Sequence, residues 1–96
     1  MLPKFKIELN VCGVNEGQDV DALSDIRSEI NMRPHLKLLH ISWDKALRKV
    51  RVVLETEGLV LETTANQMAE ELFEIACAVL NSIDGLHIEV ISSQQA

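Results

Sequence analysis

Hydrophobic and polar residues alternate along the first segment of the chain. Apolar side chains occupy every second position from residue 5 to residue 11, and lysine, glutamate and asparagine lie between them. This period of two predicts a strand with one covered face and one open face. The residues that follow, Gly13 to Gln18, carry neither a strand pattern nor a helix pattern, so we expect a loop there.

A first helix is predicted from about Asp19 to just before Pro34. Its apolar residues recur at intervals of three and four, which places them on one side of a helix: Val20, Leu23, Ile26 and Ile30. Asp19 and Asp21 fall in the first turn, where carboxylates cap free amides and complement the helix dipole. Arg33 precedes a proline and is therefore disfavoured in the helical conformation, which ends the element.

Residues 35 to about 57 read as two strands joined by a turn at 44–48. The first strand is expected to cover Leu39, Ile41 and Trp43 and to leave Leu38, His40 and Ser42 on the open face. The second strand covers Val50, Val52 and Leu54 and leaves Arg51, Val53 and Glu55 open. Their β-branched residues favour strands.

Two near-copies, Val53-Leu54-Glu55-Thr56 and Val60-Leu61-Glu62-Thr63, flank Glu57 and Gly58. They could form a hairpin that adds a short strand, or one strand followed by the lead-in to a helix. We favour the lead-in.

The second helix has the clearest pattern. Thr64 and Gln67 have the spacing of a capping box, which predicts a helix start near Thr64. The apolar residues of this helix fall in one continuous arc: Ala65, Met68, Ala69, Leu72, Phe73, Ile75, Ala76, Val79, Leu80 and Ile83. Gly85 suits the left-handed conformation after a helix, and alternation from Leu86 onward predicts a last strand.

The predicted order is strand, helix, strand, strand, helix, strand, in one domain over residues 1–96. Right-handed crossovers place both helices on the same face of one sheet. We therefore expect an α+β fold, a ferredoxin-like βαββαβ sandwich with a four-stranded antiparallel sheet in the order 4-1-3-2. The other face of the sheet is expected to lie open.

Charge and composition narrow the function classes. Nine lysines and arginines against 15 aspartates and glutamates give a net charge of −6, which argues against a nucleic-acid partner. Two isolated cysteines, no signal-peptide pattern and no apolar run of membrane-spanning length favour a soluble cytoplasmic protein without a membrane partner. We expect no cofactor.

Metal binding and catalysis lack a local signature. His40 and His87 are predicted on opposite edges of the sheet, and neither a C-x-x-C motif nor a histidine pair at i, i+4 is present, so we expect no metal site. Cys12 lies near a helix start, but the acidic residues that follow it oppose a thiolate. No catalytic residues are assigned, although Cys12, His40 and Glu55 would be the candidates for a site formed between subunits.

The layout, with glycines between the first strand and the first helix, resembles the ACT-type regulatory domain. That resemblance implies a pairing domain with a small-molecule effector near the loop, at Gly13, Val14, Asn15, Gly17 and Gln18. The Asp-Arg-Pro-Gly-like entry to the first helix is replaced here by Asn15-Glu16-Gly17-Gln18-Asp19.

We expect a non-catalytic, self-associating domain that regulates or binds a ligand or partner; a small enzyme with a site between subunits is the alternative. Dimerisation is expected through the open face of the sheet or an edge strand. The expected interface residues on the open face are Leu38, His40, Val53 and Ile91.

Overall fold

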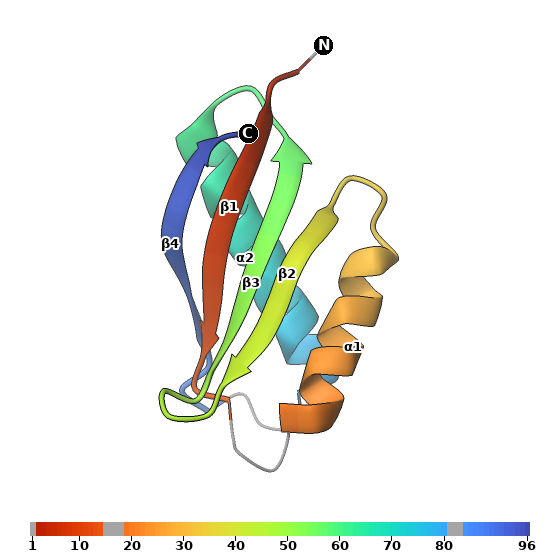
Figure 1. Ribbon diagram of the computed structural model, residues 1–96, viewed down its shortest axis with the longest axis vertical. Helices are drawn as coiled ribbons and strands as arrows, with labels where there is room; N and C mark the ends of the chain where they lie inside the picture. Colours follow the sequence, from red (N-terminus) through yellow and green to blue (C-terminus); the bar gives the residue numbers. More distant parts are fainter. Residues whose placement is uncertain (1, 15–18, 81–83) are drawn as a thin grey trace.

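The computed structural model describes residues 2–14, 19–80 and 84–96, which form four strands and two helices (Figure 1). The elements are β1 (Lys4–Cys12), α1 (Asp19–Asn31), β2 (Lys37–Asp44), β3 (Lys49–Glu57), α2 (Leu61–Val79) and β4 (His87–Gln95). The strands form one antiparallel sheet in the order β2-β3-β1-β4, and both helices lie on one of its faces. The fold is therefore α+β, and its strand order, counted from β4, is the predicted 4-1-3-2.

The core lies between this face of the sheet and the two helices. The central strands β1 and β3 contribute residues that stand opposite one another in the register, such as Ile7 with Leu54 and Leu9 with Val52. From the helices, Ile26 and Leu72 pack into the same cluster of buried side chains. The period-two and helical patterns therefore predict the covered faces of β1, β3 and α1 correctly.

Helix α2 begins three residues before the predicted capping box. Its N-cap is Val60, and the backbone N–H of Thr64 already donates to the Val60 carbonyl at 2.9 Å. Thr64 is buried against the turn at Gly58, where an added Cβ would lie only 2.0 Å from the Thr64 hydroxyl. Thr64 therefore packs against this turn and is not the N-cap residue that the sequence predicts. β3 ends at Glu57 and α2 begins at Leu61, with no strand between them. The second near-copy therefore leads into the helix, as favoured, and the alternative of an extra hairpin strand is wrong.

The open-face assignment of Leu38 is wrong because β2 contains an irregularity. Leu38 stands opposite Leu54, a core residue, whereas His40 stands opposite Val53, so Leu39 is the extra residue between them. One extra residue reverses the faces of all positions on one side of it. Leu38 packs against the core, and Leu39, predicted to be covered, is exposed.

The prediction that Phe73 lies in the core is wrong, because its side chain is 40% exposed. It lines an open groove between α2 and β4, and since β4 is an edge strand, no further strand among the described residues covers it. Val90, on the covered side of β4, is 40% exposed for the same reason. Ile83, the last residue of the predicted arc, lies outside the described residues. Neither α1 nor α2 is long and apolar enough to cross a membrane.

Candidate functional site

Three side chains with different chemistry meet where β1 ends and β4 begins. Cys12 stands directly opposite His87 in the antiparallel register, and Glu89 follows His87 by two residues on the same face of β4. The Cys12 thiol donates a hydrogen bond to Oε1 of Glu89 at 2.8 Å. The ligand atoms of all three residues lie within 4.8 Å of one another. We call Cys12, His87 and Glu89 the strand-end cluster.

The protonation states in this cluster follow from burial and charge. Cys12 is 2% exposed, and burial, together with its hydrogen bond to Glu89 and the charge of that carboxylate, raises the pKa of the thiol to about 11. The hydrogen bonds from Cys12 and from Lys49, whose Nζ lies 2.9 Å from Oε1, lower the pKa of Glu89. Cys12 therefore remains a thiol at neutral pH and is a poor nucleophile by itself.

The orientation of His87 is fixed by the backbone. Its Nδ1 lies 3.0 Å from the carbonyl oxygen of Gly85. A carbonyl can only accept, so Nδ1 carries the proton and Nε2 presents its lone pair when the ring is neutral. Gly85 in turn touches Gly13, where a Cβ would lie 2.4 Å from the Gly85 oxygen. This close backbone approach holds the end of β1 beside the start of β4.

A second feature is an apolar groove at the edge of the molecule. Helix α2 and strand β4 enclose a cavity of about 400 Å³, lined by Ala69, Glu70, Phe73, Glu74, His87 and Ile88. Ala69, Phe73 and Ile88 contribute apolar groups to its lining, and Glu70 and Glu74 contribute carboxylates. We call it the α2–β4 groove.

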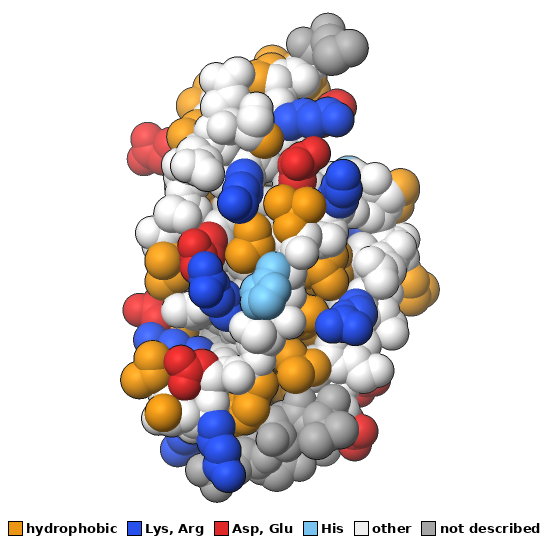
Figure 2. Space-filling model, viewed as in Figure 1, with side chains coloured by type: hydrophobic (Ala, Val, Ile, Leu, Met, Phe, Trp, Pro, Cys, Tyr) orange, Lys and Arg blue, Asp and Glu red, His pale blue; other side chains and the backbone are white. Residues whose placement is uncertain are grey.

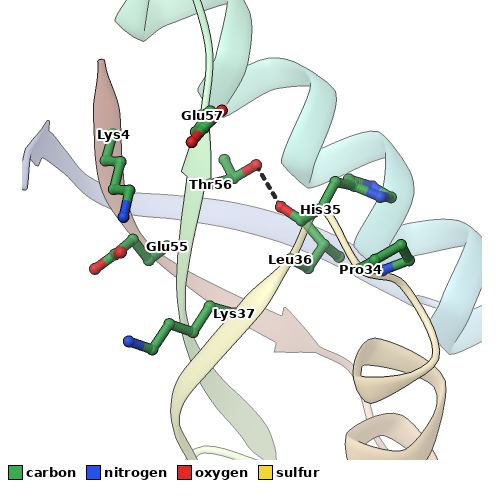
Figure 3. A pocket seen from close by; sticks show the side chains of 8 residues that line it. All are labelled: Lys4, Pro34, His35, Leu36, Lys37, Glu55, Thr56 and Glu57. Carbon is green, nitrogen blue, oxygen red and sulfur yellow. Dashed lines mark hydrogen bonds between the residues drawn. The ribbon is translucent and has the colours of Figure 1, made fainter. Parts of the chain in front are cut away.

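The third feature is a cavity of about 300 Å³ at the end of the sheet opposite Gly13 (Figure 3). Lys4, Lys37 and Glu55 extend on one side of β3, whereas Leu36 lies on the other side. Thr56 closes the gap by donating to the His35 carbonyl at 2.9 Å. Because β3 separates the charged groups from the apolar wall, the cavity does not gather them around one ligand.

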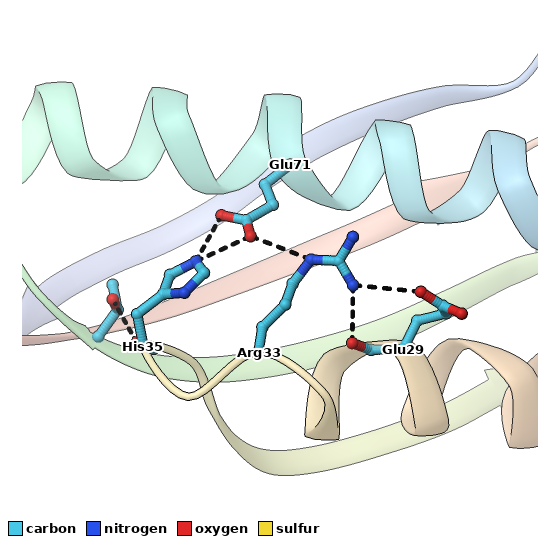
Figure 4. Close-up of polar contacts among 5 residues, drawn as sticks. Glu29, Arg33, His35 and Glu71 are labelled. Carbon is cyan, nitrogen blue, oxygen red and sulfur yellow. Dashed lines mark hydrogen bonds and ion pairs between the residues drawn. The ribbon is translucent and has the colours of Figure 1, made fainter.

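The connection between α1 and β2 carries a network of ion pairs (Figure 4). Arg33 donates to the backbone carbonyl of Glu29 at 2.8 Å, and its Nε lies 3.2 Å from Glu71 of α2. Nε2 of His35 lies 2.8 Å from the same Glu71 oxygen. Glu71 of α2 therefore contacts the segment that follows α1, so this network joins the two helices. A structural role accounts for its four charged or titratable side chains.

The residues predicted to bind a ligand at the first loop have structural roles where they are described. Val14 is buried, and its backbone N–H and carbonyl both bond Arg48, at 3.3 Å and 3.4 Å. Gly13 has a φ of +81° and makes the close contact with Gly85. Asn15, Gly17 and Gln18 lie outside the described residues.

Of the four predicted interface residues, two lie on the open face with exposed side chains, His40 and Ile91. Leu38 faces the core. Val53 is on the open face but only 6% exposed, between its register partners Glu8 and His40. Figure 2 shows apolar side chains and charges of both signs intermixed on this face. Of the three apolar anchors expected on the open face, Ile91 alone has an exposed side chain there.

The strand-end cluster leaves no signal in local spacing, because Cys12 lies far from His87 and Glu89 in the sequence. The alternation of the first strand places Cys12 on the open face, and the alternation of the last strand places His87 and Glu89 there as well. In the order 4-1-3-2 these two strands are antiparallel neighbours, so the end of one meets the start of the other. The predicted faces and the predicted strand order, taken together, therefore place Cys12, His87 and Glu89 near one another.

No family model matches the chain, and neither the curated proteins nor the solved structures include a significant match.

Proposed function

We propose that the chain is a non-catalytic binding domain with a ferredoxin-like fold that self-associates through the free edge of β4. The observation that supports this proposal is the α2–β4 groove, an apolar surface beside an unprotected strand edge. Phe73, which lines this groove, and Val90, on the helix-covered side of β4, are each 40% exposed.

The two edges of the sheet differ in their protection. Exposed edge strands usually carry lysine, proline or a covering element, which discourages pairing with another chain. Both edge strands carry a register shift, at Leu39 in β2 and at Ile91 in β4, and a helix packs on each of them. They differ in sequence, because β2 begins with Lys37 whereas β4 contains no lysine and no proline. The outer edge of β4 is therefore the less protected of the two.

A second copy of this chain is the occupant that we propose. About a two-fold axis, β4 runs antiparallel to its own copy, so the same edge supplies both the donors and the acceptors. The same arrangement brings the two α2–β4 grooves side by side, and Phe73 and Val90 then become buried between the copies. The net charge of −6 on each copy opposes this association, and salt screens that repulsion.

The competing function, a small enzyme with a site between subunits, has less support. Cys12, its strongest nucleophile candidate, keeps its proton at neutral pH because of burial and the neighbouring Glu89. Catalysis needs a nucleophile, a base and an orienting group arranged around one reacting atom. A carboxylate that accepts the thiol hydrogen bond stabilises the protonated thiol, which is the opposite of activation.

Sedimentation equilibrium over a concentration series tests self-association. The wild type is expected to form a dimer that strengthens with added salt, and Phe73→Glu is expected to shift it to monomer. Met32→Glu is the matched control, because Met32 is also an exposed apolar residue but lies away from β4. The proposal fails if the wild type is monomeric throughout, or if Phe73→Glu dimerises as well as Met32→Glu does.

Amide hydrogen exchange locates the interface independently. Backbone N–H groups on the outer edge of β4 are expected to gain protection as protein concentration rises, while those of β2 do not. Concentration-dependent protection of β2 instead would assign the dimer to the other edge.

The effector role rests on the ACT resemblance and on the loop that begins at Gly13. Free amides at a helix start can bind an anionic group, and the acidic neighbours favour a zwitterion over phosphate. A thermal-shift screen of amino acids and nucleotides, followed by amide chemical-shift mapping, tests this role. Shifts at Gly13 and Val14 would support it, and shifts confined to α2 would exclude it.

A further inference from the structure

We propose that the strand-end cluster of Cys12, His87 and Glu89 is a binding site for a divalent transition-metal ion of the Zn²⁺ class. The thiol sulfur, an imidazole nitrogen and a carboxylate oxygen converge within 4.8 Å of one another on the open face of the sheet. These three donor types are the ones that Zn²⁺ takes in proteins. His87 also lines the α2–β4 groove, but all three ligands come from one chain, so the site does not depend on self-association.

The spacing of the three ligand atoms is close to that required. Tetrahedral Zn²⁺ with bonds of roughly 2.0–2.3 Å holds its ligand atoms about 3.3–3.8 Å apart. The Cys12 sulfur and Oε1 of Glu89, 2.8 Å apart, would have to separate by about 0.5–1 Å, and no pair of ligand atoms would have to approach by more than about 1.5 Å. His87 is exposed and the Glu89 side chain is 42% exposed, so side-chain rotation supplies this movement while buried Cys12 stays in place.

His87 already makes the supporting hydrogen bond that is typical of a metal ligand. Histidines that bind metals usually donate their other ring N–H to a carbonyl or carboxylate, which fixes the tautomer. The Nδ1–H of His87 makes this bond to Gly85 at 3.0 Å. Nε2 is therefore the nitrogen with a free lone pair, and the Gly13–Gly85 contact holds the supporting carbonyl in place.

The donor set selects the class of metal. A thiolate disfavours Mg²⁺ and Ca²⁺, which prefer all-oxygen ligands, and favours Zn²⁺ and its spectroscopic substitute Co²⁺. Three protein ligands leave a fourth position for water, on the solvent side of the cluster. Binding forms the metal–sulfur bond and releases the thiol proton to solvent, with no change of oxidation state.

The Lys49 ammonium competes with a metal ion for the Glu89 carboxylate. Its ammonium lies 2.9 Å from Oε1 of Glu89, where it partly neutralises the carboxylate and repels a cation. Removing that charge should therefore increase metal affinity, whereas removing any ligand should decrease it. Opposite responses at adjacent residues distinguish a built site from general attraction of cations to an acidic protein.

Titration of the full chain with Co²⁺ and Zn²⁺, under reducing conditions and without chelators, tests the proposal. We expect one metal ion per chain and a thiolate-to-Co²⁺ charge-transfer band in the near ultraviolet. Cys12→Ser should abolish the band, and His87→Gln and Glu89→Gln should weaken affinity about 10- to 100-fold. Lys49→Gln should strengthen it several-fold. Affinity should rise about tenfold per pH unit, because one thiol proton is released.

Two variants serve as matched controls. Cys77→Ser removes the other free thiol, and His40→Gln removes a histidine from the same open face; both should leave the band and the affinity unchanged. The band should also survive in Phe73→Glu, so a failure of the dimer leaves this test intact. The proposal is overturned if the wild type shows no thiolate band, or if the band persists in Cys12→Ser and disappears in Cys77→Ser. Circular dichroism of each variant confirms that the fold is retained.

Discussion

Replacing Gly13 by alanine should be among the most damaging small substitutions in this chain. Gly13 has a φ of +81°, which costs an alanine about 1–2 kcal/mol. An added Cβ would also lie 2.4 Å from the carbonyl oxygen and 2.8 Å from the carbonyl carbon of Gly85, so the backbone itself has to move. Overpacking of this kind costs about 1–3 kcal/mol. We therefore expect a total loss of about 2–5 kcal/mol for Gly13→Ala.

Gly85→Ala separates the two contributions. Gly85 has a φ of +76°, close to that of Gly13, but a Cβ placed there meets nothing within 4 Å. It should lose only the conformational part, about 1–2 kcal/mol. Urea unfolding of both variants measures the difference. If the two losses agree within about 0.5 kcal/mol, the close approach of the two glycine backbones carries no energy and the reasoning is refuted.

Three further predictions concern the core, the helix network and pH. Leu72→Ala and Ile7→Ala should each cost about 2–5 kcal/mol in urea unfolding, because both side chains are fully buried; losses under about 0.5 kcal/mol would mean that they lie outside the core. Arg33→Ala should cost about 1 kcal/mol, and the exposed Arg27→Ala much less, since Arg33 bonds both Glu29 and Glu71. Stability should fall between pH 9 and about pH 11, because the folded state holds the thiol proton of Cys12 more tightly than the unfolded state; the fall should be smaller in Cys12→Ala, and an equal fall would exclude the thiol.

Local periodicity predicts most of the elements because it records which side of each element is buried. The alternation around Ile7 and the three-and-four spacing around Ile26 each describe one continuous element with one covered side. Right-handed crossovers then restrict the strand order to few choices. For these elements the sequence pattern is sufficient, since burial of an apolar face is the dominant favourable term in folding.

Periodicity fails where a single residue interrupts it or where the sheet ends. The extra residue at Leu39 moves Leu38 to the core, and nothing in the segment Leu38-Leu39-His40-Ile41 specifies which leucine is displaced. Phe73 fits the apolar arc of α2, but whether it is covered depends on the strand that lies beneath it. That strand is the last one in the sheet, which only the assembled structure determines.

The sequence pattern is sufficient to predict the type and order of the elements and the covered faces of the central strands, and it restricts the strand order to few choices. The tertiary structure alone decided which polar residues meet. Cys12 and Glu89 are separated by 77 positions, and they make contact because β1 and β4 are antiparallel neighbours in a particular register. Hydrophobic periodicity reports the environment of each element, whereas a cluster of polar side chains depends on the register between elements. That register is fixed by packing and by close backbone contacts such as Gly13 against Gly85.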